Sequence, residues 1–174
     1  MKRGITQLVL LCVALALGLW TWRVLFPSPD QLIRKKLIEL AQLASFNSNE
    51  APLAKAINSQ KMVSLCTPDV EISIDTAGRA PQTIRGQNDL GRAALAARSA
   101  ISGLSIEFLD VNISVDPDKR SATVDLTAKG RIAGDSDLLV QELKIIFKKI
   151  GGSWLITRVE TIKALSQQTA LYFL

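Results

Sequence analysis

The 174-residue chain contains no histidine, one tyrosine and few aromatic residues of any kind. Histidine is the side chain whose charge changes near neutral pH, and it is the commonest metal ligand in proteins. Its absence excludes Ser–His and Cys–His nucleophile pairs. The loop aspartates near residues 116–118 and 135–137 lack the spacing of a calcium-binding EF-hand loop. We therefore expect no metal and no cofactor.

Cysteine is also scarce. Cys12 lies within an apolar N-terminal run, and Cys66 stands alone in the rest of the chain. A lone cysteine cannot form a disulfide within its domain, so the hydrophobic core must hold the domain together. With no histidine to activate it, Cys66 is expected to be a buried structural residue.

The chain has little excess of either charge beyond its N-terminal end. Three of the 21 basic residues (Lys2, Arg3 and Arg23) flank the apolar run, and all 16 acidic residues follow it, which leaves the body with a net charge of about +2. Nucleic-acid binding needs a concentrated basic face. No nucleic-acid partner is therefore expected.

One long apolar run is present, from Leu8 to Trp20, after the basic start Met1-Lys2-Arg3. The span from Ile5 to Trp22 would form a helix about 27 Å long, close to the bilayer core of about 30 Å. Tryptophans at its end suit the membrane interface. Residues 1–26 are therefore predicted to be a single transmembrane signal anchor.

A cleaved secretory signal is the competing interpretation of residues 1–26. The small residues of Ala16-Leu17-Gly18 fit a cleavage site, but cleavage there would leave an apolar new N-terminus. The short basic tail favours an N-terminus in the cytoplasm, although Arg34-Lys35-Lys36 follow the span closely. The predicted location is the inner (cytoplasmic) membrane, with one span and a periplasmic or otherwise extracytoplasmic C-terminal domain.

The remaining residues suggest a linker at 27–30, one domain at 31–163 and an apolar tail at 164–174. Apolar residues at helical spacing predict helices over 31–46, from Pro52 onward and from Asn88 to Gly103. Alternating apolar and polar residues predict strands over 66–75, 82–85, 106–116, 121–131, 139–150 and 154–162. The apolar residues expected to face inward include Leu53 and Ile57 in the second helix, Ala97 in the third, and Leu109, Leu155 and Val159 in the strands.

This order of helices and antiparallel strands indicates an α+β fold. It resembles the nuclear transport factor 2-like superfamily, which includes ketosteroid isomerase-like and SnoaL-like polyketide cyclase enzymes. The resemblance is carried by Ile84–Leu90 (IRGQNDL), Ser121–Leu126 (SATVDL) and Phe147–Val159 (FKKIGGSWLITRV). It implies a cone in which a curved antiparallel sheet packs on about three helices, preceded here by one transmembrane helix.

In such families the mouth of the cone can bind a ligand. Isomerase-type sites need a phenol on an early helix and carboxyl groups in the pocket, whereas the only tyrosine here is Tyr172, in the tail. Dehydratase-type sites use histidine. The strand acids Asp69, Glu71, Asp110 and Asp125 alternate with apolar residues and should face solvent. No catalytic residue is therefore predicted.

Two polar residues share the inward phase of their strands: Gln141 with Leu139 and Leu143, and Thr157 with Leu155 and Val159. They are the candidate ligand-binding residues, although isolated polar residues in this phase more often satisfy backbone groups or lie at the rim of the domain.

The leading functional hypothesis is a membrane-anchored, non-catalytic protein-interaction or assembly domain, in a layout that resembles single-pass proteins of type IV secretion systems. Its partner would be another protein or a second copy of the chain. The alternative is an anchored small-molecule binder or isomerase/cyclase-like enzyme with an apolar pocket. Contact of Arg34-Lys35-Lys36 with anionic headgroups would be auxiliary to either function.

Overall fold

The computed structural model describes residues 27–75, 82–135 and 138–166. The predicted anchor, the 76–81 turn and the last eight residues of the tail lie outside them. Within the described ranges, no helix is long and apolar enough to cross a bilayer. The elements are α2 (Pro29–Ala44), α3 (Pro52–Ser64), β1 (Cys66–Ile74), β2 (Gln82–Arg85), α4 (Gln87–Ala100), β3 (Leu104–Val115), β4 (Ser121–Ile132), β5 (Leu138–Ile150) and β6 (Ser153–Ser166).

Helix α2 begins where the sequence supplies a cap. The Ser28 hydroxyl accepts a hydrogen bond from the backbone N–H of Gln31, and the Gln31 side chain accepts one from the N–H of Ser28. This capping box satisfies two backbone donors that would otherwise lack partners. The predicted apolar stripe of α2 is confirmed, since Ile33 and Leu37 are buried.

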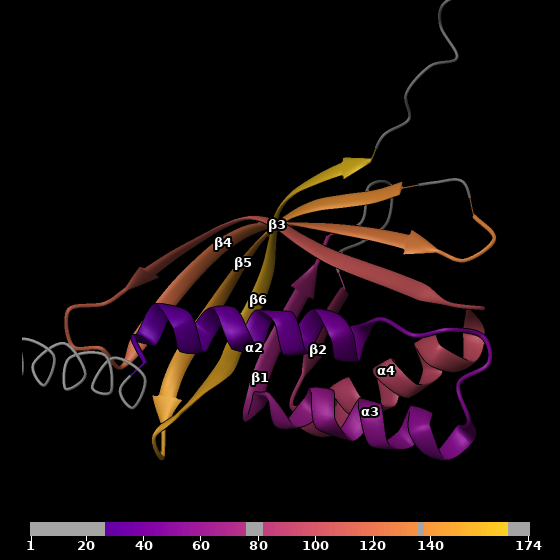
Figure 1. The fold of residues 1–174 in the computed structure, drawn as a ribbon, viewed down its shortest axis with the longest axis horizontal. Coiled ribbons are helices and arrows are strands. Elements are labelled where there is room, and N and C mark those ends of the chain that lie inside the picture. The colour runs from indigo at the N-terminus through magenta and orange to yellow at the C-terminus, as the bar shows by residue number, and fades with distance from the viewer. Residues whose placement is uncertain (1–26, 76–81, 136–137, 167–174) are drawn as a thin grey trace, which may run out of the picture.

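The six strands form one curved sheet in the order β2-β1-β6-β5-β4-β3 (Figure 1). Four of the five strand pairs are antiparallel, but β1 runs parallel to β6, with Cys66 opposite Ile156. The expected antiparallel sheet is therefore a mixed sheet. The first and last strands of the domain, β1 and β6, are neighbours within the sheet. No local sequence pattern in either strand predicts this pairing.

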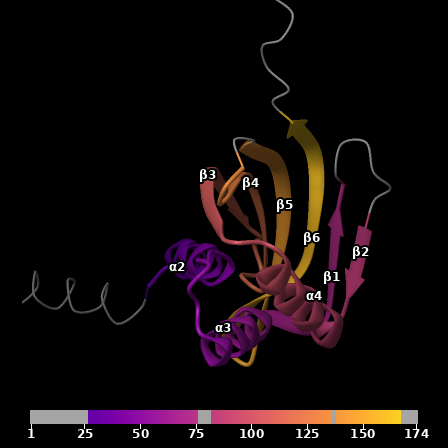
Figure 2. The same ribbon diagram turned by 90° about the vertical axis from the view of Figure 1, so that its right-hand side faces the viewer.

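The helices cover one face of this sheet (Figures 1 and 2). The predicted inward residues of β4 are confirmed, with Ala122, Val124 and Leu126 buried. They pack with Phe147 of β5 and Ile33 of α2 in a single core cluster. The alternation of β4 therefore predicts its buried face correctly.

Register shifts change the phase of other strands, and two of them, in β3 and β6, bear on the predicted inward residues. The β3–β4 register shifts between Leu109 and Asn112, and Asp110 has a φ of +52° there. Phe108 consequently faces inward, whereas Leu109, expected inside, is exposed. A bulge adds one residue to one strand, which reverses the alternation and bends the strand.

A register shift also changes which residues of β6 face inward, compared with the prediction. The register of β6 against β5 shifts between Ile146 and Phe147. Before this shift Trp154 and Ile156 are buried, instead of Leu155, and after it Val159 packs against the core as expected. Thr157 falls at the shift itself.

In helices α3 and α4, some of the buried residues also differ from those predicted to face inward. Leu53 and Ile57 of α3 are 72% and 44% exposed, and Ser59 and Val63 are buried instead. In α4 the buried residue of the last turn is Arg98, and its neighbour Ala97 is exposed. Arginine is almost never fully buried without a partner.

Candidate functional site

A cavity of about 410 Å³ lies between the concave face of the sheet and the helices. Its volume is within the range of about 300–1,000 Å³ typical of small-molecule sites. The lining is overwhelmingly apolar. It consists of Leu40 and Ala44 of α2, Met62 of α3, Cys66, Ile72 and Ile74 of β1, Leu90 of α4, Leu104, Ile106 and Phe108 of β3, Ala128 and Gly130 of β4, Leu139, Gln141 and Leu143 of β5, and Ile156 and Val159 of β6.

The local sequence explains why this space is left between the layers. The bulges in β3 and β6 bend these strands and contribute to the curvature of the sheet, whose concave face lies toward the helices. The cross-strand neighbours of Leu139 and Gln141 on β4 are Gly130 and Ala128, whose side chains are too small to fill the space. Small residues opposite large ones therefore keep this part of the concave face open.

Gln141 lines the cavity. Its Nε2 donates a hydrogen bond of 3.2 Å to the carbonyl oxygen of Asp75, at the end of β1. No described hydrogen bond engages its side-chain oxygen, which can therefore accept one from a ligand.

Thr157 is not among the residues that line the cavity. Its hydroxyl donates a 3.2 Å hydrogen bond to the carbonyl oxygen of Ile146 on β5. The bulge leaves that carbonyl near Thr157, so the side chain satisfies the backbone of the sheet. The structure thus places Gln141 and Thr157 in different surroundings, although the sequence grouped them.

The other polar side chain in the lining is Cys66, which is buried and has no disulfide partner. Burial raises the pKa of its thiol to about 11. At neutral pH it is therefore a protonated, weakly nucleophilic thiol, as expected for a structural cysteine.

No carboxylate lines the cavity. The strand acids that the sequence placed on the solvent side all lie elsewhere. Glu71 contacts Arg85 and Arg158 at 3.0 Å each. The hydrogen bond from Arg85 is the main cause that holds the pKa of Glu71 below its usual value. Desolvation acts in the opposite direction, but this bond together with the charges of Arg158 and Arg85 outweighs it. Glu71 is thus a charged member of a surface ion-pair network.

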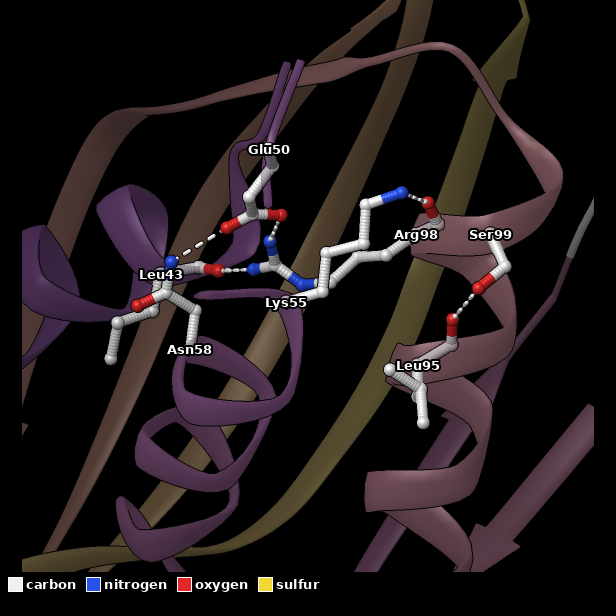
Figure 3. Close-up of polar contacts among 7 residues, drawn as sticks. All are labelled: Leu43, Glu50, Lys55, Asn58, Leu95, Arg98 and Ser99. Carbon is white, nitrogen blue, oxygen red and sulfur yellow. Dashed lines mark hydrogen bonds and ion pairs between the residues drawn. The ribbon is translucent and has the colours of Figure 1, made fainter. Parts of the chain in front are cut away.

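A second polar cluster lies between α3, α4 and the loop after α2 (Figure 3). The Arg98 side chain is 2% exposed, and its Nη1 lies 2.6 Å from Oε2 of Glu50. Its Nη2 donates to the carbonyl oxygen of Leu43, and its guanidinium lies 4.8 Å from the centre of the Phe46 ring. Asn58 donates to the other oxygen of Glu50 at 2.6 Å.

This cluster is fully satisfied. Burial by itself would raise the pKa of Glu50, but hydrogen bonds from Asn58 and Arg98 and the charges of Arg98 and Lys55 outweigh it, so the pKa is lowered. Lys55 donates to the carbonyl oxygen of Arg98 at 3.1 Å. The cluster therefore fixes the loop and the two helices in place, and it leaves no group directed at a ligand.

This cluster was not predicted from the sequence. An arginine in an alanine-rich helix is an available signal, but its acidic partner lies 48 residues earlier in the chain. Among the described residues, no group of three or more potential metal-ligating side chains occurs.

A groove of about 570 Å³ runs between the outer side of α2 and the edge strand β3. Its apolar residues include Ile38 of α2, which is exposed, and Phe108 and Val111 of β3. Within the described chain, β3 pairs with β4 on one side. On the other side Leu104, at its start, bridges to Phe46, and the N–H of Ile106 donates to the Ser45 hydroxyl at 2.9 Å. The groove therefore borders a largely unpaired strand edge.

Comparisons with known proteins bear on the fold. No family model matches the sequence, and no curated protein matches it. Many solved structures are similar in three dimensions. A nuclear transport factor 2-like protein with a cystatin-like fold from Novosphingobium aromaticivorans is 16% identical, with a TM-score of 0.59 and 86% of each chain covered.

A protein of unknown function from Mycobacterium tuberculosis is 15% identical, with a TM-score of 0.61, and the match covers 78% of this chain and 76% of that one. A candidate scytalone dehydratase from Novosphingobium aromaticivorans is 13% identical, with a TM-score of 0.57 and coverage of 81% and 89%. At these identities a likeness carries the fold and not the activity. The three helices and the six-stranded mixed sheet therefore have the nuclear transport factor 2-like α+β fold.

Proposed function

We propose that this protein is a membrane-anchored, non-catalytic binding domain that holds a compact, largely apolar molecule in the concave cavity. The observation that carries this proposal is the cavity itself, about 410 Å³ in volume and lined by apolar side chains together with Gln141 and Cys66. Burial of apolar surface would supply the affinity. The side-chain oxygen of Gln141 would select a ligand with one hydroxyl or amine donor.

The chemistry of the lining favours binding over catalysis. General acid–base catalysis needs a group whose pKa is near the working pH. The ionisable side chain in this lining is the Cys66 thiol, with a pKa of about 11. The domain would therefore hold its ligand unchanged.

Met62 provides a sharp test. The chain has two methionines, Met1 and Met62, and Met62 lines the cavity. The full chain, labelled with ¹³C at the methionine methyl groups and inserted in lipid nanodiscs, would be titrated with 1-naphthol, an apolar molecule with one hydroxyl. We expect a saturable shift of the Met62 signal, because a bound aromatic ring lies close to it, while Met1 reports simple partition of 1-naphthol into the bilayer.

Ala128→Leu, which fills the cavity from β4, should weaken the Met62 response. Thr123→Leu on the outer face of the same strand is the matched control and should leave the response unchanged. A Met62 signal that shifts only in proportion to ligand concentration, as Met1 does, would contradict the proposal.

A second candidate function, a protein-interaction or assembly domain, is supported by the groove beside β3. An extended segment of a partner could add a strand to this edge while placing an apolar side chain near Ile38. A photoreactive residue at position 38 should then crosslink the full chain in its own membrane to one defined partner or to a second copy. The same residue at the exposed position Ile57 of α3 is the control. Recovery of monomers alone from both positions would count against this function.

A further inference from the structure

One end of the domain gathers positive charge from three separate elements. In Figure 1 the start of α2, the β3–β4 turn and the β5–β6 turn lie together at the left. We call this surface the basic end and define it by Arg34, Lys35 and Lys36 of α2, Lys119 and Arg120 of the β3–β4 turn, and Lys148 and Lys149 of β5.

Two contacts join these elements into one surface. The backbone N–H of Lys149 donates to the carbonyl oxygen of Arg120 at 2.7 Å, so the two turns are adjacent. Lys35 and Lys36 line a hollow of about 600 Å³ together with Ser153 and Trp154, which follow the β5–β6 turn. Charged residues far apart in the sequence therefore lie at the same end of the domain.

The positive charge of the basic end is only partly compensated. Arg34 pairs with Asp30 at 2.9 Å and Lys36 with Glu39 at 3.0 Å. The other five cations have no ion pair within the described part of the chain, although Asp69 lies within electrostatic reach of Lys148. With Asp116 and Asp118 of the β3–β4 turn, five acids stand against seven cations at this end.

The basic end is also where the chain would leave the bilayer. The described chain starts at Pro27, α2 starts at Pro29, and the predicted anchor ends at residue 26. Two residues span about 7 Å at most. Anionic headgroups attract lysine and arginine within a Debye length, about 8 Å at physiological ionic strength.

We propose that the basic end rests on anionic phospholipid headgroups and so fixes the orientation of the domain on the membrane. This inference rests on the anchor proposed above and not on the cavity. In this orientation residues 132–135, which follow β4 and lie at the opposite end in Figure 1, are directed away from the bilayer.

Hydrogen exchange of the full chain in nanodiscs tests the proposal. With phosphatidylglycerol in place of part of the phosphatidylcholine, amide exchange at residues 118–120 and 150–153 should slow by about threefold or more, because headgroup contact excludes water from these turns. Exchange at residues 132–135, at the opposite end, should not change. Raising the salt to 1 M should remove the difference, because the Debye length then falls to about 3 Å.

Charge reversal supplies matched variants. Lys148→Glu with Lys149→Glu should abolish the protection, whereas Lys129→Glu with Arg131→Glu, on β4 toward the opposite end, should leave it intact. A chain that stays with the vesicles in flotation but exchanges equally in both lipids would overturn the headgroup contact alone. A chain that does not float with vesicles would overturn the anchor and the headgroup contact together, and the cavity proposal would be unaffected.

Discussion

Replacing Arg98 by methionine should destabilise the folded domain strongly. The substitution keeps an apolar stem of similar length but removes the ion pair with Glu50, the hydrogen bond to Leu43 and the contact with the Phe46 ring. Breaking a buried ion pair costs about 3–5 kcal/mol. Because Asn58 still donates to Glu50, we expect the lower end of this range, about 3 kcal/mol.

For a domain of this size, a loss of 3 kcal/mol corresponds to a fall in Tm of about 6–12 °C. The loss of free energy can be measured by urea unfolding of the full chain in a mild non-ionic detergent, with the unfolding monitored by circular dichroism. Arg92→Met is the matched control on the same helix. Its side chain is 82% exposed and pairs with Asp89, so its loss should cost less than about 0.5 kcal/mol.

Removing both partners separates the energy of the pair from the cost of a stranded charge. Glu50→Leu combined with Arg98→Met should be more stable than Arg98→Met alone, because no unpaired carboxylate then remains buried. If Arg98→Met costs less than about 1 kcal/mol, or if the two changes are simply additive, the ion pair is not what holds the loop to α4.

Three further predictions concern pH, the thiol and the cap of α2. The pKa of Glu50 is lowered on folding from an ordinary value of 4.5, so its contribution to stability is present above pH 4.5 and is lost as the pH falls through the folded pKa. In urea unfolding, the free energy of unfolding should therefore fall less from pH 7 to pH 3.5 for Glu50→Gln than for the parent chain. Cys66, buried and with a pKa of about 11, should react with iodoacetamide at pH 7.5 only upon unfolding. Prompt modification at Cys66 in the folded chain, located by peptide mass spectrometry and distinguished from Cys12, would contradict its burial. Ser28→Ala should cost about 1 kcal/mol in the same unfolding assay, and an unchanged midpoint would mean that the capping box contributes nothing.

Strands with strict alternation were predictable from the sequence, and strands with bulges were not. In β4 the alternation continues without a shift, so the buried positions Ala122, Val124 and Leu126 are read correctly. In β3 and β6 one extra residue reverses the phase, at Asp110 and Thr157. The extra residue is visible only against the neighbouring strand, which a single sequence does not display.

The other wrong predictions of burial arise because the buried face depends on residues distant in the sequence. The burial of Arg98 depends on Glu50, and the buried face of α3 depends on which side α4 packs against, so Leu53 is exposed although it lies on an apolar stripe. The inward position of Gln141 followed from its phase with Leu139 and Leu143 on β5, but the small residues of β4 that leave room opposite it are visible only in the strand register. The position of a cavity follows from shape, which composition and periodicity encode only in part.

The parallel pairing of β1 with β6 also has a consequence for how the chain folds. The β1–β2 hairpin joins the sheet only through β6, the last strand, and Cys66 meets Ile156 there. Contacts between residues so distant in sequence slow folding, since a long loop must close first. During synthesis the N-terminus leaves the ribosome first, so the cavity-facing side of β1 stays uncovered until β6 has emerged. During that interval the nascent domain would be prone to aggregation and would be a substrate for chaperones.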